Sequence, residues 1–289
     1  MTRASRTRDD REARLAWRLM APALMLLTLL AVVPLLATVA ESFFLHDLRL
    51  PWLGRPFVGL ANYREALADG RLREAFVRTA AFTVASVTLE LAAGLALALA
   101  LDAVGRLRGV ARAIVLLPWA LPTVVAALVW RLVFESAGGP GSAWLADPWG
   151  AWLPIVLADV WKTTPFVALL LLAGLHSIDQ DLYAAARLDG AGPWRRFVHV
   201  TLPLLRPSIV VAAVFRMLDA FRVFDLVFVL TGGGPGTATE VVSLHTLTTL
   251  LQHLRFGYGS ALATVVFLAG FLLAWLAVRA LGGFGREAR

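Results

Sequence analysis

The sequence predicts an all-α, polytopic membrane protein with six transmembrane helices. Its 289 residues are 59% hydrophobic and 16% charged, whereas soluble chains are about 45–50% apolar and about 25% charged, so most of its exterior does not meet water. Crossing about 30 Å of hydrocarbon takes about 20 apolar residues in a helix, and six stretches are long enough. They cover residues 19–40, 75–101, 113–130, 152–175, 202–230 and 260–281.

Each stretch is expected to be helical, because every backbone amide in hydrocarbon must be bonded internally and the alternation of a barrel strand is absent. The first stretch also fits a secretory signal peptide, since arginines precede it and Thr38-Val39-Ala40 resembles a cleavage site. However, its apolar run is about 20 residues long, against about 7–15 in a signal peptide. We therefore expect an uncleaved first span.

The distribution of basic residues predicts the orientation, because cytoplasmic loops are enriched in Lys and Arg. With the N-terminus inside, 16 of the 27 basic residues fall on the cytoplasmic side and 8 on the opposite side, while Lys162, Arg216 and Arg222 lie within spans. Both termini are therefore expected in the cytoplasm, in agreement with six spans. Because the basic residues sit at the ends of apolar stretches and form no stripe, we expect no nucleic-acid partner.

The chain divides into a basic cytoplasmic N-terminal arm, residues 1–18, a six-span transmembrane domain, residues 19–281, and a cytoplasmic tail, residues 282–289. The fourth connection, residues 176–201, is longer than the other cytoplasmic loops. No connection outside the membrane resembles a catalytic domain, although residues 231–236 form a glycine-rich turn. The sequence has no cysteine and only scattered histidines, so neither disulfides nor a catalytic metal is expected.

The fourth connection predicts a helix-turn-helix elbow. Residues 182–188 are alanine-rich and favour a helix, and Asp189-Gly190 supplies a turn, because Gly accepts positive φ and Asp bonds its own backbone. Pro193 fits the first position of a second short helix, residues 194–200. Apolar side chains on short cytoplasmic helices need a partner surface. Those expected here are Tyr183, Ala185, Ala186, Trp194 and Phe197.

At these residues the chain resembles a known family. The run Ala185-Ala186-x-x-Asp189-Gly190-Ala191 with Leu202-Pro203 is similar to the "EAA" loop of permease subunits of bacterial ABC importers. Other stretches of the chain resemble the carbohydrate-uptake branch of this family, particularly the maltose- and trehalose-type permeases. These stretches are Val58-Gly59-Leu60-Ala61-Asn62-Tyr63, Trp161-Lys162-Thr163-Thr164-Pro165-Phe166, Leu230-Thr231-Gly232-Gly233-Gly234-Pro235 and Phe256-Gly257-Tyr258-Gly259-Ser260-Ala261. One departure is Ala184, which replaces the family glutamate, so the salt bridge of that glutamate is not implied.

The resemblance implies the ABC importer type I permease fold in the bacterial inner membrane. It also implies a second permease subunit, two ATPase subunits, an extracytoplasmic sugar-binding protein and a sugar as substrate. In that family the loop inserts into the ATPase, so the resemblance assigns coupling to Ala185, Ala186, Asp189 and Gly190. ATP and Mg would be bound by the partner and by no part of this chain, because the single lysine, Lys162, lies in a span and no phosphate-binding GxxxxGK[ST] loop is present.

Charged residues inside the spans mark pathways or buried pairs. Spacings of three predict that Asp159 lies beside Lys162, and that the fifth span carries an alternating ladder of Arg216, Asp219, Arg222 and Asp225. These groups either neutralise one another to hold the helices in register or line a polar translocation path, and both can hold for different members. Glu90, the one charged residue of the second span's apolar core, is expected to be a hydrogen-bonding group that packs toward the other helices.

The substrate is expected between the fourth and fifth spans. Asp159, Thr163 and Phe166 share one helical face, and Lys162 lies on a neighbouring one. Arg216 and Asp219 reach middle depth in the fifth span, and in maltose-type relatives the corresponding helices line the sugar cavity. A sugar needs polar partners together with an apolar ring face. The balanced charges favour a neutral sugar over a phosphate ester, although glycerol phosphate or polyols stay open as substrates.

Two other classes of function remain to be weighed. A proton-coupled secondary transporter would use Glu90 and the charged ladder, but the elbow and the absence of an inverted repeat argue against it. An intramembrane enzyme is a weaker alternative, because no GxSxG surrounds a serine and no acid pair is expected where water and substrate meet. The sequence therefore favours a transport subunit that performs no bond chemistry.

Overall fold

The computed structural model describes residues 2–104, 108–135 and 141–284. Arg106, counted in the second cytoplasmic connection, and Arg286 and Arg289, counted in the tail, lie outside the described residues. Over the described ranges the chain is helical, and β structure is limited to the isolated bridges of Phe44 with Phe57 and Asp47 with Arg255. The prediction of an all-α protein is confirmed.

Five helices of the described residues are long and apolar enough to cross a membrane, and a bent pair adds a sixth. The first, Leu15–Glu41, consists of the end of α1 (Thr2–Leu27), a π-helical turn (Thr28–Val32) and α2 (Val33–Glu41). The others are α4 (Gly70–Ala103), the bent pair α5 (Arg108–Ala120) and α6 (Thr123–Glu135), α8 (Trp152–His176), α11 (Leu202–Phe221) with the segment before it, and α14 (Phe256–Phe284). Shorter helices are α3 (Ala61–Ala68), α7 (Gly141–Ala146), α9 (Gln180–Leu188), α10 (Pro193–Arg196), α12 (Asp225–Leu230) and α13 (Val242–Leu251).

The chain forms two compact units. The first contains residues 1–68 and 248–265. In it the segment after α2 is braced by Asn62, whose buried side-chain amide donates to the carbonyls of Ser42, at 2.8 Å, and Phe44, at 3.0 Å. Gly257 lies so close to the Phe44 carbonyl that a side chain would not fit there. These contacts fix the loop between α2 and α3 against the start of α14.

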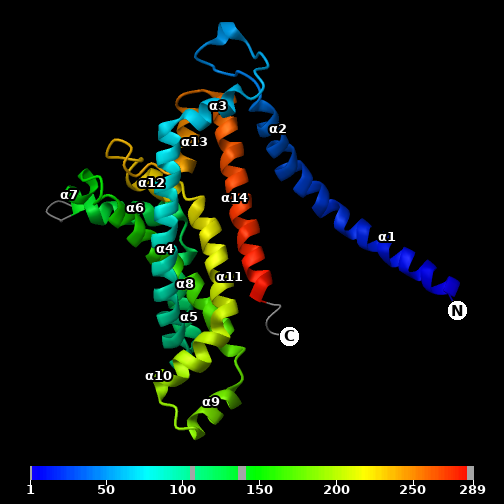
Figure 1. Ribbon diagram of the computed structural model, residues 1–289, viewed down its shortest axis with the longest axis vertical. Coiled ribbons are helices and arrows are strands. Elements are labelled where there is room, and N and C mark those ends of the chain that lie inside the picture. Colours follow the sequence, from blue (N-terminus) through cyan, green and yellow to red (C-terminus); the bar gives the residue numbers. More distant parts are fainter. Residues whose placement is uncertain (1, 105–107, 136–140, 285–289) are drawn as a thin grey trace. The chain divides into compact units, whose positions relative to one another are not determined.

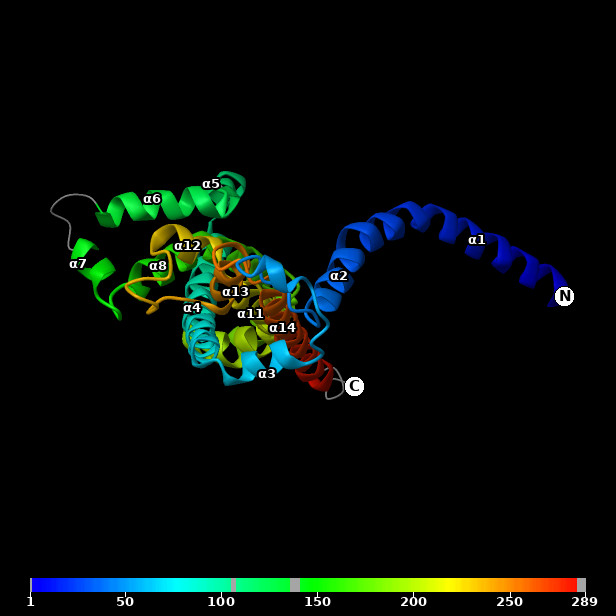
Figure 2. The same ribbon diagram turned by 90° about the horizontal axis from the view of Figure 1, so that it is seen from above.

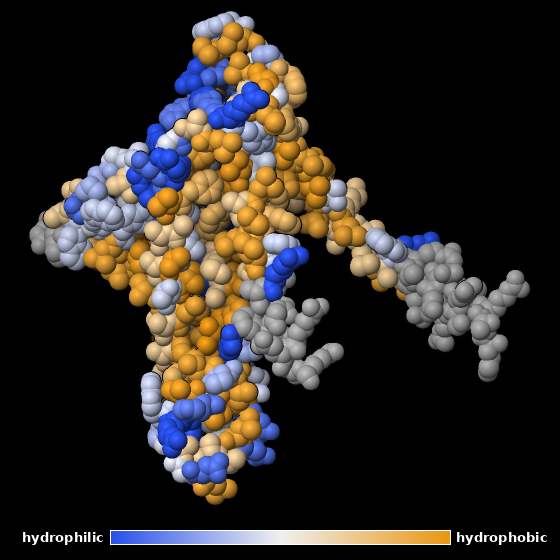
Figure 3. All heavy atoms as spheres, in the orientation of Figure 1, coloured by the Kyte–Doolittle hydropathy of each residue, from blue (hydrophilic) through white to orange (hydrophobic). Residues whose placement is uncertain are grey.

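The second unit, residues 69–247 and 266–289, holds the core of packed spans. Its helices α4, α8 and α11 run side by side (Figures 1 and 2). Gly94 permits the close approach of α4 and α8, because a Cβ there would lie 2.5 Å from Val167 Cγ1. Along these helices hydrophobic side chains cover the outer face, while hydrophilic ones gather at the elbow end (Figure 3), as expected for helices in contact with lipid.

The third span differs from the prediction of one helix over residues 113–130. It breaks between α5 and α6, which are bent by 86° relative to each other. Pro122 stands at this break, where it lacks an amide donor and disfavours helical geometry at Leu121. The apolar composition of the stretch therefore concealed a change of direction.

The fifth span also differs from the predicted bounds, residues 202–230. The continuous helical segment begins at Pro193, because α10 passes through a π-helical turn, Phe197–Thr201, directly into α11. The elbow's second helix and the fifth span are thus one rod. It ends at Phe221, and α12 starts a new direction at Asp225. This break lets Leu226 and Val227 pack into the core beside Ile155 of α8.

Candidate functional site

A buried ionic network joins the three packed spans of the second unit. Arg216 of α11 donates from Nε and Nη2 to the carboxylate of Glu90 on α4, at 2.5 and 2.7 Å. Its Nη2 also donates to Oδ2 of Asp159 on α8, at 3.1 Å. Glu90 is fully buried and Arg216 is 2% exposed. In such surroundings charges persist only when paired and hydrogen-bonded, so this network fixes α4, α8 and α11 in register.

Hydroxyl groups complete the network. The Ser86 hydroxyl lies 2.5 Å from Asp159 Oδ2 and 3.1 Å from Glu90 Oε1, and its one hydrogen can be donated to either. Thr163 donates to Glu90 Oε1 at 2.7 Å. Arg216 Nη1 also bonds to Asp219, whose side chain is 65% exposed. The network therefore runs from a fully buried carboxylate to one that is accessible.

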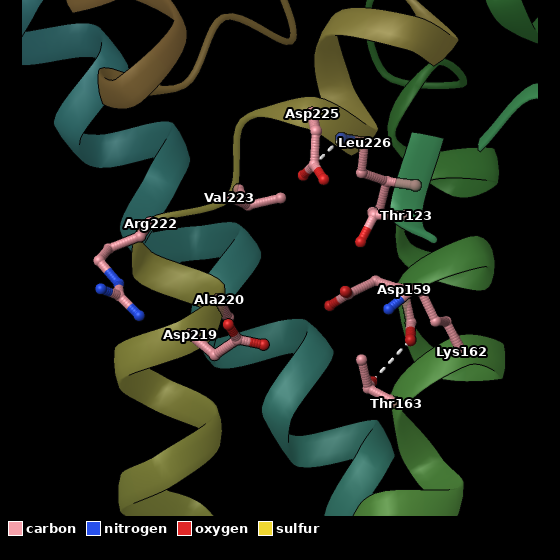
Figure 4. A pocket seen from close by; sticks show the side chains of 10 residues that line it. All are labelled: Thr123, Asp159, Lys162, Thr163, Asp219, Ala220, Arg222, Val223, Asp225 and Leu226. Atoms are coloured by element: carbon pink, nitrogen blue, oxygen red, sulfur yellow. Dashed lines mark hydrogen bonds between the residues drawn. The ribbon is translucent and has the colours of Figure 1, made fainter. Parts of the chain in front are cut away.

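A polar cavity of about 380 Å³ lies beside the accessible end of this network. It occupies the two helix breaks, since Thr123 begins α6 and residues 222–224 connect α11 to α12. Figure 4 shows side chains from α8, from the end of α11 and from α12 around it. The lining residues are Thr123, Asp159, Lys162, Thr163, Asp219, Ala220, Arg222, Val223, Asp225 and Leu226. Discontinuous helices expose backbone polar groups and commonly form binding sites in transporters.

The structure places the six predicted pathway residues in two groups. Four of them line the cavity, namely Asp159, Lys162, Thr163 and Asp219. Arg216 lies behind the cavity, where it bonds to the carboxylates. Phe166 does not line the cavity, and its ring stacks instead on Trp119, with centroids 5.6 Å apart. The face expected to offer a sugar both polar partners and an aromatic ring is therefore polar only.

Two predicted charge pairings are wrong. Asp159 pairs with Arg216 of another helix, and no ion pair joins it to Lys162 among the described residues, although both line the cavity. The ladder over the fifth span is interrupted, since the helix ends at Phe221. Only the pair of Arg216 and Asp219 keeps helical spacing, whereas Arg222 donates to the Leu218 carbonyl. The expectation that Glu90 is a hydrogen-bonding group within the bundle is confirmed.

Sequence reasoning missed two participants and one pairing. Ser86 gave no signal, because a serine in a span is common. Thr123 could have been found, since it follows a proline inside an apolar stretch and can begin a new helix. Glu90 was noticed, but its partner was not. A lone acid in one span requires a base from another, and the fifth span supplies it.

The cavity offers partners for a polar ligand. Carboxylates and cationic groups both line it, and hydroxyl-rich ligands use them as acceptors and donors. Among the described residues no group of three or more histidines and carboxylates could hold a metal ion.

The elbow forms as predicted, at residues 179–201. Asp179 is the N-cap of α9, and its carboxylate accepts a hydrogen bond of 2.9 Å from the amide of Asp181. Gly190 follows the helix with φ 75°, which favours glycine, and the Ala191 amide returns to the Ala186 carbonyl at 2.9 Å. A hydrogen bond of 3.0 Å between the hydroxyl groups of Tyr183 and Thr201 joins the two arms of the elbow. The elbow is thus a braced unit.

Its outer surface exposes large apolar side chains among polar and charged ones. Leu188 is 90% exposed and Trp194 is 74% exposed, and a hollow of about 690 Å³ lies beside Trp194 and Phe197. Of the four residues assigned to coupling, Ala185, Asp189 and Gly190 are exposed and Ala186 is half-buried. Ala184, at the position of the family glutamate, is half-buried as well.

A helical protein with broken spans around a polar cavity, and with an elbow at one end that exposes apolar side chains, has the construction of a membrane transport component. The comparisons define the class further. The chain belongs to the family described as binding-protein-dependent transport system inner membrane components, whose model matches residues 91–281. This membership decides against the secondary-transporter and enzyme alternatives, and it places the chain among inner-membrane proteins.

Similar proteins cover nearly the whole chain. The trehalose/maltose transport system permease protein MalF of Thermococcus litoralis is 42% identical, over 96% of this chain and 96% of its own. The trehalose transport system permease protein SugA of Mycobacterium tuberculosis is 39% identical, over 94% of this chain and 90% of its own. A bacterial ABC transporter that imports the acidic polysaccharide alginate has a similar fold, with a TM-score of 0.79 at 20% identity, covering 95% of this chain and 97% of that one.

Proposed function

We propose that this chain is one of two permease subunits in an ATP-driven importer of a neutral sugar, of the trehalose and maltose class. The observation that carries the proposal is the polar cavity at the two helix breaks. The names of the relatives support the sugar class, since both MalF and SugA are described as trehalose permeases at about 40% identity. Glycerol phosphate fits less well, because no excess of positive groups lines the cavity.

The proposed orientation places both termini and the elbow in the cytoplasm. The excess of arginine on that side supports it. The loop of residues 231–241 then faces the outside, together with the segment between α2 and α3. In this orientation the cavity lies between the cytoplasmic and the outer face of the membrane. The rod from Pro193 to Phe221 joins the elbow to it.

The proposed energy source is a pair of separate ATPase subunits that bind ATP and Mg and dock on the elbow. The exposed Leu188 and Trp194 support docking, because large apolar side chains exposed on a cytoplasmic segment favour contact with a partner. We assign the contact to Ala185, Ala186, Asp189 and Gly190. Movement of the elbow would travel along the continuous rod to Arg216 and Asp219, about 33 and 38 Å from Trp194 at 1.5 Å per residue. An extracytoplasmic sugar-binding protein and a second permease complete the assembly.

Reconstitution tests the proposal. The chain, its neighbouring permease and the ATPase are placed in proteoliposomes, and uptake of labelled trehalose is measured with the binding protein outside and ATP inside. We expect uptake to require both ATP and the binding protein. A transporter whose uptake follows a proton gradient without ATP would contradict the proposal. Uptake of glycerol phosphate in preference to trehalose and maltose would correct the substrate class.

A further inference from the structure

The buried carboxylate of Glu90 is linked to the cavity through its hydrogen-bond partners. It faces away from the outer surface of α4, and both of its oxygens are occupied, by Arg216 on α11 and by Thr163 on α8. The cavity does not include Glu90. However, each of its partners either lines the cavity or bonds to a residue that does.

Three cavity residues depend on this carboxylate. Thr163 donates directly to Glu90. Asp159 and Asp219 accept from the same guanidinium that Glu90 holds through two hydrogen bonds. Arginine is planar and its five donors have fixed directions, so fixing Nε and Nη2 also fixes where Nη1 points. Glu90 therefore sets the positions of Asp159, Thr163 and Asp219 from behind the cavity wall.

The same carboxylate affects the charge that the cavity presents. The cavity and the network behind it contain four carboxylates and three cationic groups. Without the negative charge of Glu90, the buried Arg216 would be compensated by fewer acids, and in a region of low dielectric constant this difference reaches the cavity. We infer that Glu90 is a positioning residue of the substrate path, which sets the geometry of the cavity and shifts its electrostatic balance against anionic ligands. This inference rests on the proposed function only in treating the cavity as the substrate path.

The absence of cysteine from the sequence allows a direct test. Thr123→Cys introduces one thiol into the cavity wall of the complete transporter, and its modification by an anionic and by a cationic thiosulfonate reagent is followed on this chain. Glu90→Gln keeps the size of the side chain and removes its charge. In Glu90→Gln we expect the ratio of the modification rate by the anionic reagent to that by the cationic reagent to rise about threefold or more. The reason is that a unit charge in such a site changes the local electrostatic potential by at least about one thermal unit.

Two further variants separate charge from geometry. Glu90→Asp keeps the charge but shortens the side chain, so we expect a rate ratio near that of the parent together with reduced trehalose uptake. Glu74→Gln is the matched control on the same helix, since Glu74 is exposed and pairs with Arg78 at 2.7 Å, and we expect it to leave ratio and uptake unchanged.

An unchanged rate ratio in Glu90→Gln would overturn the inference, and so would an equal rise in Glu90→Asp. The labelling requires no transport, so these results stay distinct from a failure of the proposed function, which would appear as absent ATP-dependent uptake in the parent protein.

Discussion

At the scale of single residues, two neighbouring threonines of α8 show how position decides importance. Thr163 and Thr164 are both buried. The Thr163 hydroxyl bonds to Glu90 and to the Asp159 carbonyl. The Thr164 hydroxyl is buried without a hydrogen-bond partner among the described residues. A polar group that is buried and unbonded costs stability, whereas one bonded to a charge contributes to it.

This contrast leads to a first prediction. Thr163→Val should lower the free energy of unfolding by about 1.5–3 kcal/mol, the value of a hydrogen bond to a charged group. It should also reduce trehalose uptake, because Thr163 lines the cavity. Thr164→Val is the control and should be neutral or slightly stabilising. Thermal unfolding in detergent and uptake in proteoliposomes measure both effects. Equal destabilisation by the two variants would show that the hydroxyl of Thr163 is not specifically held.

At the scale of elements, helix contacts and turns depend on particular glycines. Gly94 allows α4 to touch α8, while Gly70 at the start of α4 faces open space. In the elbow, Gly190 has φ 75° and also faces open space, so it is required by backbone conformation and not by packing within this chain. Substitution of Gly94 should therefore disturb helix packing, whereas substitution of Gly190 should strain the turn of the elbow.

Gly94→Ala should destabilise the transmembrane core by about 1–3 kcal/mol, the usual cost of forcing extra atoms into a packed contact. The added methyl would lie 2.5 Å from Val167 Cγ1, and α4 and α8 would have to separate. Gly70→Ala places the same methyl on the same helix without a contact and should change little. The melting temperature of the purified complex is the measurement. If Gly94→Ala were as stable as Gly70→Ala, the helices would not be in the close contact described.

Gly190→Trp should leave the chain inserted in the membrane but abolish ATP-dependent uptake, since a bulky side chain at the tip of the elbow strains the turn and obstructs docking. Gly109→Trp is a comparable change at another open position of a proposed cytoplasmic segment, and we expect it to retain uptake. ATPase co-purification and uptake are measured together. Uptake at the parent level in Gly190→Trp would remove the elbow from the coupling path.

At the scale of the whole molecule, segments distant in sequence close one end of the second unit. Arg71 donates through two hydrogen bonds, of 2.6 and 2.8 Å, to Glu240, which lies 169 residues later. The Val242 amide donates to Thr79 at 2.9 Å, and Trp152 donates to the Ala238 carbonyl at 3.1 Å. The glycine-rich loop is thereby fastened to α4 and α8.

The ion pair of Glu240 gives a prediction that depends on pH. Burial opposes ionisation of this carboxyl, but His245 and Arg71 lower its pKa below the ordinary value. A lowered pKa means that the contribution to stability is present above the unfolded-state pKa, near 4.5, and is lost as the pH falls through the folded-state value. Glu240→Gln should therefore cost about 1–3 kcal/mol at pH 7, and the difference from the parent should narrow below about pH 4.5.

Thermal unfolding at several pH values measures this effect. Glu135→Gln, which removes the exposed partner of Arg131, is the control and should have almost no effect at any pH. A deficit in Glu240→Gln that is the same at pH 7 and at pH 4 would show that the carboxylate charge is not what fastens the loop.

The sequence by itself determined that the spans are helical, as well as the turn of the elbow and the glycine-rich turn, because these depend on local properties. It did not show the breaks in the third and fifth spans. A run of about 20 apolar residues in a membrane can only be a helix. Asp189-Gly190 requires a turn wherever the chain lies. The continuity of the elbow with α11 was not visible, since Pro193 and Pro203 suggest separate helical starts, and the π-helical turn at Phe197–Thr201 joins them.

The tertiary structure alone decided which charges meet. Glu90 and Arg216 are 126 residues apart, and only the packing of α4 against α11 brings them together. The break at residues 222–224 contains neither glycine nor proline, so it arises from the burial of Leu226 and Val227 and not from local preference. Likewise, helical spacing puts Phe166 on one face with Asp159 and Thr163, but in the structure its ring stacks on Trp119 and does not line the cavity. Helical periodicity gives relative directions around one helix, whereas the rotation of that helix toward its neighbours depends on contacts that only the folded chain makes.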